Sequence, residues 1–224
     1  MQEKTITLPV AEAYDRWSGF YDTYDNPMVF GASHVVRALA GDVAGRDVVE
    51  FGCGTGRNLA LLKQAGAATL TGCDLSEGML AQARQRDPAL VLLLQDMTQP
   101  LPLPDGSADL VLFSLALEHV EEMEAPLREA KRLMRPQARL TIVEIHPFLS
   151  LSGLAAHFED GGELVQMPTF AHTFAEYLNV FSRLDLRMVE YREWRPRDFG
   201  PAVPAKVFKR GADTPLLVEF SLRL

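Results

Sequence analysis

The fold is decided by one stretch of sequence, Val48-Val49-Glu50-Phe51-Gly52-Cys53-Gly54-Thr55-Gly56. It begins as a short apolar run of the kind that forms a buried strand. Its glycines at alternate positions let the backbone turn tightly and approach a ligand without side-chain collision. A helix predicted over Asn58 to Ala65, with Gly66 as its stop signal, would present free amide groups to this loop. The stretch therefore indicates a site for a dinucleotide, a phosphate or another nucleotide.

The residues on either side of the glycines narrow this choice. A dinucleotide fingerprint has its third glycine three residues after the second, where this chain has Arg57, and Gly56 comes one residue early. No Gly-Lys-Ser/Thr sequence follows, which excludes a P-loop. The carboxylate of Glu50 would repel a pyrophosphate, so a cationic ligand group suits this position better.

Apolar runs and helical patterns alternate along the chain, which is typical of a parallel α/β sheet covered on both faces. Ser76 is expected to cap one helix, an apolar stripe over 127–134 marks another that ends at Arg135-Pro136, and Thr173 to Glu176 has the capping-box pattern. Two late strands, 184–194 and 216–222, predict a closing antiparallel hairpin. The predicted parallel strands are Asp47–Phe51, Thr69–Cys73, Leu90–Leu94, Ala108–Phe113 and Leu140–Ile145.

Acidic residues end three successive strands of this predicted sheet. Asp74 lies 24 residues after Glu50, where a carboxylate can bond the two ribose hydroxyls of an adenosine. Asp96 ends the next strand and is followed by Met97, which suits an adenine amino group beside an apolar surface. A single acid at a strand end is often only a turn or a helix cap, whereas three in succession favour a nucleoside site.

With these features the sequence resembles the class I S-adenosylmethionine-dependent methyltransferases, of the group that acts mostly on small molecules. Glu50 to Gly56 matches the family's first motif, which lies against the amino-acid part of the cofactor. Gly72-Cys73-Asp74-Leu75-Ser76 with Met79 matches the ribose-binding second motif, and Gln95-Asp96-Met97 resembles the adenine-contacting third. Residues 108–120 and 127–145 resemble the fourth and fifth strands with the segments beside them, so that the resemblance spans 45–146.

The resemblance implies a Rossmann-like α/β fold with a seven-stranded sheet of order 3-2-1-4-5-7-6, strand 7 antiparallel, helices on both faces and an N-terminal helical lid. It also implies S-adenosyl-L-methionine as the cofactor. One departure is Gln137-Ala138, where the family usually has two glycines in a turn. We expect a single domain with an N-terminal helical cap (1–40), a cofactor-binding core (45–146) and a lid segment with closing strands (147–224).

The N-terminal segment Val10 to Phe30 is rich in aromatic residues and precedes the first strand of the core. It is expected to pack on the sheet, to close over the ligand, or both. In similar enzymes an aromatic residue of this segment often lies over the cofactor. The expected cofactor-binding residues are Tyr14, Trp17, Tyr21, Glu50, Gly52, Cys53, Gly54, Gly56, Asn58, Asp74, Leu75, Met79, Asp96, Met97 and Ser114.

Methyl transfer from a sulfonium needs alignment and exclusion of water, and a general base only when the acceptor arrives protonated. His119 follows the fourth strand, His146 follows the fifth, and His172 precedes the capped helix, so all three can reach the ligand edge of the sheet. A structural role is the simpler reading of each histidine alone, but we expect at least one to touch substrate. Tyr21 is a further catalytic candidate. No residue spacing predicts a metal site.

Composition fits one globular domain of 224 residues, with 47% hydrophobic and 23% charged residues. A net charge of -8 opposes nucleic-acid binding. No secretory signal or membrane span is predicted, Cys53 and Cys73 are expected to be reduced, and we expect a cytoplasmic monomer or homodimer. Six basic residues near the C-terminus are either a solvated face or a clamp for a carboxylate-bearing substrate: Arg192, Arg195, Arg197, Lys206, Lys209 and Arg210.

The predicted function is therefore methylation of nitrogen or oxygen on a small-molecule metabolite. One alternative keeps the cofactor but lets its own amine attack the aminobutyrate arm, in a cyclase or lyase that releases methylthioadenosine. Two others are an RNA methyltransferase, which the acidic balance disfavours, and a non-catalytic binding protein, which the complete motif set disfavours.

Overall fold

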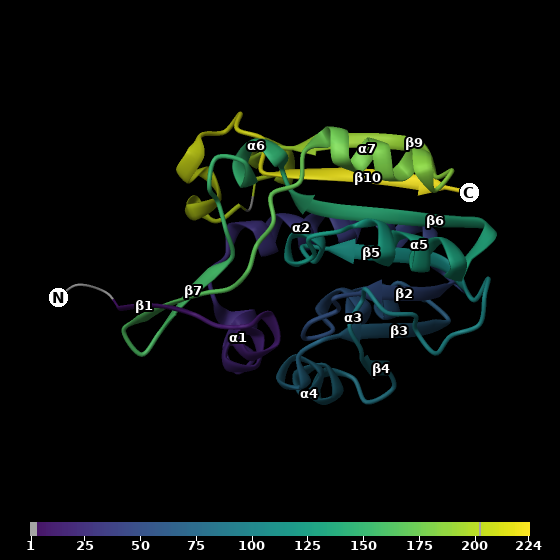
Figure 1. Ribbon diagram of the computed structural model, residues 1–224, viewed down its shortest axis with the longest axis horizontal. Coiled ribbons are helices and arrows are strands. Elements are labelled where there is room, and N and C mark those ends of the chain that lie inside the picture. The colour runs from purple at the N-terminus through teal and green to yellow at the C-terminus, as the bar shows by residue number, and fades with distance from the viewer. Residues whose placement is uncertain (1–3, 202) are drawn as a thin grey trace.

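The computed structural model describes residues 4–201 and 203–224 and contains one large and one small sheet (Figure 1). The large sheet has the order β4-β3-β2-β5-β6-β10-β9, in which β10 is antiparallel to both of its neighbours. Numbered along the core, this is 3-2-1-4-5-7-6, so the predicted fold and the antiparallel closing strand are confirmed. The strands of the large sheet are β2 (Asp47–Phe51), β3 (Thr69–Asp74), β4 (Val91–Leu94), β5 (Ala108–Ser114), β6 (Met134–Ile145), β9 (Arg187–Trp194) and β10 (Leu217–Arg223).

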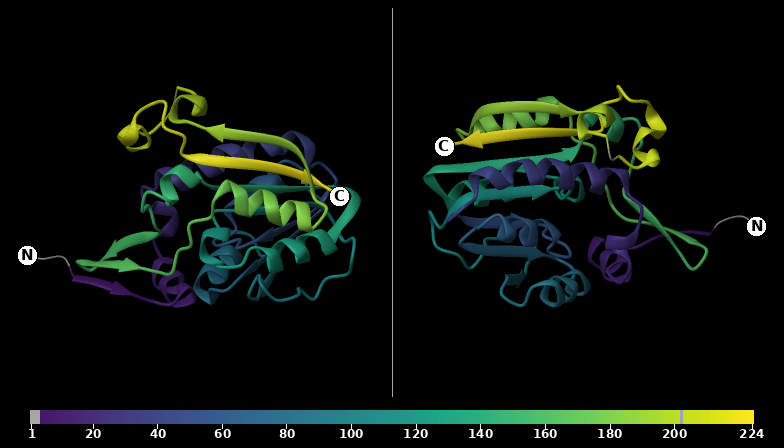
Figure 2. Two further views of the ribbon diagram at one scale, coloured as in Figure 1. Left: turned by 45° about the horizontal axis from the view of Figure 1, so that its top comes forward. Right: turned by 180° about the vertical axis from the view of Figure 1, so that it is seen from behind.

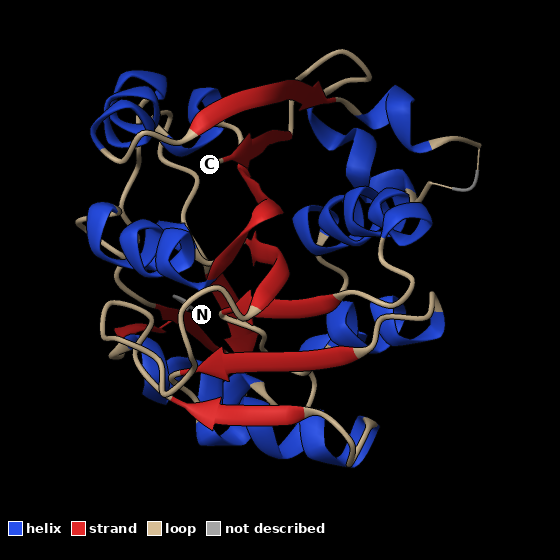
Figure 3. Cartoon of the chain, turned by 90° about the vertical axis from the view of Figure 1, so that its right-hand side faces the viewer, coloured by secondary structure: helices blue, strands red, loops and turns tan. Residues whose placement is uncertain are grey.

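Helices cover both faces of this sheet (Figure 3). The helices are α1 (Val10–Trp17), α2 (Pro27–Ala38), α3 (Arg57–Gln64), α4 (Glu77–Arg86), α5 (Glu124–Leu133), α6 (Pro147–Ser150) and α7 (Phe174–Arg183). The 3-10 turns are η1 (Tyr21–Thr23), η2 (Leu39–Asp42), η3 (Leu117–His119), η4 (Pro196–Phe199) and η5 (Ala205–Arg210).

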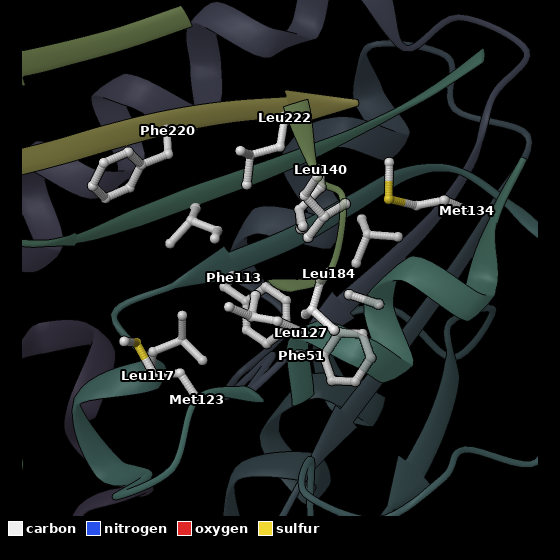
Figure 4. Close-up of a cluster of buried hydrophobic side chains, with 14 of the residues drawn as sticks. Phe51, Phe113, Leu117, Met123, Leu127, Met134, Leu140, Leu184, Phe220 and Leu222 are labelled. Atoms are coloured by element: carbon white, nitrogen blue, oxygen red, sulfur yellow. The ribbon is translucent and has the colours of Figure 1, made fainter. Parts of the chain in front are cut away.

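Alternate residues of β2 and β5 point to opposite faces of the sheet and belong to two hydrophobic clusters. On one face Val48 and Leu110 pack with side chains of α2, α3 and α4. On the other face Phe51, Phe113 and Phe220 pack with α5 and α7 (Figure 4). The Phe51 and Phe113 rings stack with centroids 4.7 Å apart. Because strands buried on both faces need apolar residues at nearly every position, the sequence shows continuous apolar runs here.

Both predicted caps are present. The Ser76 hydroxyl accepts a hydrogen bond from the Met79 amide at the start of α4. At α7, Glu176 N donates to Thr173 Oγ1 and Thr173 N donates to Glu176 Oε2, which completes the capping box. These side chains satisfy amides that the first turn of a helix leaves free.

Two strands begin at least three residues away from their predicted starts, whereas the other strand boundaries differ by at most one residue. The late strand predicted from Leu184 begins only at Arg187, because α7 runs to Arg183 and a turn with Asp185 at φ 50 follows. The fifth strand begins at Met134, directly after α5, so Arg135-Pro136 ends the helix and starts β6. Gln137-Ala138 accordingly lies within β6 and not in a turn.

The region expected to be an N-terminal helical cap contains α1 and α2, and it also contains a strand that the sequence did not predict. β1 (Lys4–Thr7) pairs with β8 (Glu163–Gln166), which forms a hairpin with β7 (His157–Asp160). This small sheet extends from the body at the end where α1 lies (Figure 2). Its strands have only four residues each. β7 and β8 each bury a single side chain, Phe158 and Val165, and β1 buries none, which is too few for the apolar alternation that predicts a strand.

Two aspartates of the N-terminal segment fix it to the core. Asp15 Oδ1 of α1 accepts hydrogen bonds from Ser76 Oγ and from Gly78 N at the start of α4. Asp22 Oδ1 of η1 accepts one from Thr55 Oγ1 in the glycine loop. The segment is thereby anchored to the loops at the carboxyl ends of the strands. Among the described residues, no helix combines the length and apolar character needed to cross a bilayer.

Candidate active site

The glycine loop after β2 depends on backbone conformations that favour glycine. Gly52 has φ 66, and a Cβ built on it would lie only 2.7 Å from Ala116 Cβ in the loop after β5. No other residue fits this position without displacing that loop. The loops after β2 and β5 therefore meet closely and form one wall of a cleft.

Asp74, at the end of β3, holds the glycine loop in place. Its Oδ2 accepts a hydrogen bond from Gly54 N at 2.8 Å, and its Oδ1 accepts one from Ser76 N at 2.9 Å. Burial raises the pKa of Asp74, while the amides of Ser76 and Gly54 oppose that shift. The carboxylate also borders the cleft, where it is available to a ligand.

A cavity of about 390 Å³ opens between these loops and α1. Its volume lies within the usual range of cofactor sites, about 300–1,000 Å³. It brings together eleven of the predicted site residues: Tyr14, Tyr21, Gly52, Gly54, Asp74, Leu75, Met79, Asp96, Met97, Ser114 and His119. We call it the first cavity.

Five expected cofactor residues lie outside the border of the first cavity. Glu50 is buried behind the loop, where Asn58 Nδ2 donates to its Oε1 at 2.7 Å, and burial raises the pKa of Glu50 to about 8. Cys53 is buried beneath the loop, and Gly56 is the N-cap of α3. The fifth, Trp17, stacks on Phe158 with ring centroids 4.6 Å apart.

The sequence prediction also missed ten residues that border the first cavity. Most belong to the loop after β5 and the start of α5, whose sequence carries no glycine or strand-end signal. Leu115 is notable because it has φ 55, a left-handed conformation that is rare for a leucine. The missed residues are Val10, Cys73, Gln95, Thr98, Leu115, Ala116, Val120, Glu121, Glu122 and Ala125.

His119 and Tyr14 form a hydrogen-bonded pair at the edge of the first cavity. His119 Nδ1 lies 2.9 Å from the Pro168 carbonyl, which can only accept, so Nδ1 carries the proton. His119 Nε2 therefore accepts from Tyr14 Oη, 2.8 Å away. Burial lowers the pKa of His119 and raises the pKa of Tyr14 well above its usual value, so both groups are neutral at pH 7.

His146 and His172 do not border the first cavity, and their contacts are structural. His146 Nδ1 accepts from the Phe148 amide as the N-cap of α6, and its Nε2 lies 3.3 Å from Glu193 Oε1. His172 Nε2 lies 2.9 Å from the Val120 carbonyl and 3.2 Å from the Leu117 carbonyl. His172 thus supports the loop that carries His119.

A second cavity of about 180 Å³ adjoins the first. The two share Tyr14, Tyr21 and Leu115, which form the wall between them. Burial raises the pKa of Tyr21 to about 12. Trp17, expected to contact a cofactor, borders this second cavity instead. The site therefore consists of a larger cavity beside the strand ends and a smaller one beneath the aromatic N-terminal segment.

Comparison with known proteins agrees with this geometry. A family of methyltransferase domains matches residues 49–142. A demethylmenaquinone methyltransferase of Beutenbergia cavernae is 33% identical over 153 residues, which are 64% of this chain and 63% of the relative. A malonyl-[acyl-carrier protein] O-methyltransferase of Serratia marcescens is 33% identical over 135 residues, 57% of this chain and 49% of the relative. The matches thus span about half to two thirds of these relatives' length.

Solved structures show the same fold over most of the chain. An S-adenosylmethionine-dependent methyltransferase from Mesorhizobium loti superposes with a TM-score of 0.69 at 24% identity, covering 85% of this chain and 96% of that one. Magnesium protoporphyrin IX methyltransferase from Synechocystis, solved with S-adenosylhomocysteine, gives 0.64 at 20% identity, with 96% and 95% covered. Residues 49–142 therefore match a methyltransferase domain, and the chain shares its fold with solved methyltransferases.

Proposed function

We propose that this protein transfers the methyl group of S-adenosyl-L-methionine to nitrogen or oxygen of a small molecule. The observation that carries the proposal is the first cavity, in which Asp74, Asp96 and the glycine loop converge at the ends of three neighbouring strands. The names of the relatives, which are methyltransferases, point to the same reaction. No observation supports the cyclase or lyase alternative.

The residues of the first cavity fit the parts of this cofactor. Gly52 and Gly54 bring backbone without side chains to its amino-acid arm. Asp74 offers acceptor oxygens to the ribose hydroxyls. Asp96, whose Oδ1 accepts from Thr98 N at 2.8 Å, would accept from the adenine amino group, and Met97 would offer an apolar surface to the ring. The bound cofactor supplies a methyl group already activated by its sulfonium.

The protein's own contribution to the reaction is placement and exclusion of water. Tyr14, Tyr21 and Leu115 border both cavities, so the donor and the acceptor meet at this wall. A nitrogen or oxygen acceptor that arrives protonated must lose its proton. The His119 lone pair at Nε2 accepts a proton through Tyr14 Oη, while the Pro168 carbonyl holds the ring in place.

Calorimetric titration with S-adenosylhomocysteine tests the cofactor site. Asp74→Asn should weaken binding at least tenfold, because the neutral amide replaces a charged acceptor, whereas Asp42→Asn on the exposed η2 turn should leave it unchanged. Equal affinities of the two variants would contradict the placement. Incubation with S-adenosylmethionine alone distinguishes methyl transfer from the cyclase or lyase reaction. If methylthioadenosine formed without an added acceptor, the methyl-transfer proposal would be wrong and the cyclase or lyase reaction would take its place.

We further propose that the chain acts as one domain in the cytoplasm, as a monomer or homodimer, without nucleic acid. Cys53 and Cys73 are both free and buried, which suits a reducing compartment. The net charge of -8 opposes phosphate binding. Light scattering after size-exclusion chromatography gives the oligomeric state. Salt-dependent binding to tRNA would contradict the proposal that the protein acts without nucleic acid.

A further inference from the structure

The structure divides the basic residues near the C-terminus into two groups. Arg192 lies over the Trp194 ring, 3.6 Å from its centroid, Arg195 bonds Glu193 at 2.7 Å, and Arg197 pairs with Asp213. These three arginines are engaged outside the second cavity. Lys206, Lys209 and Arg210, all on η5, border that cavity instead.

The charges at the border of the second cavity leave a positive excess. Lys206 is partly neutralised, because its Nζ donates to the Asp25 carbonyl and lies 3.8 Å from Asp25 Oδ2. Over residues 4–201 and 203–224, neither Lys209 nor Arg210 forms an ion pair. Two cationic side chains therefore remain available at the rim.

Deeper in the second cavity, two buried polar atoms lack partners within the described chain. They are Trp17 Nε1 and Glu118 Oε2, and their residues are only 2% and 8% exposed. Buried polar groups are nearly always hydrogen-bonded, so unpaired ones that border a cavity point to a ligand. Both atoms belong to residues beside the wall shared with the first cavity, where methyl transfer is proposed.

The size and lining of the second cavity limit what it can hold. Its volume of about 180 Å³ slightly exceeds the roughly 150 Å³ of an engineered cavity that binds benzene. Tyr14, Trp17, Tyr21 and Tyr24 supply aromatic walls. A ring of six atoms with one or two substituents fits such a space, and its flat faces suit aromatic neighbours.

We propose that the second cavity binds the methyl acceptor and that this acceptor is a ring-sized organic carboxylate. Its carboxylate is held at the rim by Lys209 and Arg210, while a polar group at its other end reaches Trp17 Nε1 and Glu118 Oε2. The inference rests on the proposed function, because it assigns the acceptor side of the same reaction.

The test uses two probes of the same size and shape, the anion 4-hydroxybenzoate and its neutral amide, 4-hydroxybenzamide. Each is titrated calorimetrically into the full chain saturated with S-adenosylhomocysteine. The carboxylate should bind at least tenfold more tightly than the amide. In the double variant K209Q/R210Q the affinities should become equal, whereas Arg197→Gln, on η4 and outside the cavity, should keep the preference.

Equal binding of both probes to the unaltered chain, or no binding of the carboxylate at millimolar concentration, would overturn the inference. A preference that survives in K209Q/R210Q would also overturn it, since the charge would then be recognised elsewhere. Lys209 and Arg210 are exposed, so the double variant should fold, which circular dichroism verifies. Binding of S-adenosylhomocysteine is measured first. Failure of this binding would contradict the proposed function, whereas loss of the carboxylate preference with the cofactor product still bound would contradict only the present inference.

Discussion

Replacing Gly52 by alanine adds one methyl group at the point where the loops after β2 and β5 meet. The new Cβ would lie 2.7 Å from Ala116 Cβ and 3.4 Å from Met97 Cε. Ala116 is 3% exposed and its amide donates to Glu144 Oε1 at 3.0 Å, so it cannot withdraw freely. Either the loop after β5 shifts or the glycine loop does.

The cost has two parts. Alanine at φ 66 costs about 1–2 kcal/mol, because its Cβ approaches the following carbonyl oxygen. Overpacking against Ala116 adds about 1–3 kcal/mol. Gly52→Ala should therefore lower the free energy of unfolding by about 2–5 kcal/mol in urea titrations. Because Ala116 and Met97 border the first cavity, affinity for S-adenosylhomocysteine should fall more than tenfold.

Gly54→Ala is the matched control. Gly54 has φ 53, yet a Cβ built there meets nothing within 4 Å, so only the conformational cost of about 1–2 kcal/mol applies. Equal losses of unfolding free energy in the two variants would refute the steric reasoning. Adding Ala116→Gly to Gly52→Ala should recover part of the loss, a coupling that a double-mutant cycle measures.

Three further predictions concern single side chains. Burial raises the pKa of Glu118 from 4.5 to about 8, so the stability that its protonated form contributes is complete below pH 4.5 and is lost as the pH rises through 8. Urea titrations at pH 5.5 and 7.5 should therefore show that the free energy of unfolding declines less steeply with pH in Glu118→Gln, by up to about 1.4 kcal/mol per pH unit. The exposed-site control Glu12→Gln should leave the decline unchanged. Tyr14→Phe leaves His119 Nε2 unpaired, which should lower the unfolding free energy by about 1–3 kcal/mol and slow methyl transfer while S-adenosylhomocysteine still binds by calorimetry. Thr173→Ala removes the capping box, and thermal unfolding should show a loss of about 1 kcal/mol with cofactor affinity unchanged.

The core of the fold was predictable because its signals are local and strong. Each parallel strand buries both faces, so its sequence is an apolar run. The capping residues Ser76 and Thr173 indicate where α4 and α7 begin. The small sheet of β1, β7 and β8 gave no such signal. Its strands are short and bury at most one side chain each, and β1 pairs with a segment more than 150 residues away.

The convergence of residues at the first cavity was predictable for a related reason. Parallel strands end at one edge, so residues at successive strand ends, such as Asp74 and Asp96, converge without any knowledge of loops. Glu50 also ends a strand, but its side chain is buried behind the loop and bonded to Asn58. Sequence position placed it at the edge, whereas the direction of its side chain depends on the pleat and on packing.

The second cavity depends on contacts that no local pattern encodes. The second cavity draws on α1, on the start of α2, on the loop after β5, on the residues before β7 and on η5. Six basic residues looked equivalent in the sequence, yet three are paired away from the cavity and three border it. The histidines show the same limit: His119 reaches the first cavity, whereas His172, from a later segment, supports the backbone that carries it. Charge and residue type thus suggested a carboxylate clamp, and only the packing of η5 against the aromatic N-terminal segment identifies Lys209 and Arg210 as the side chains that can form it.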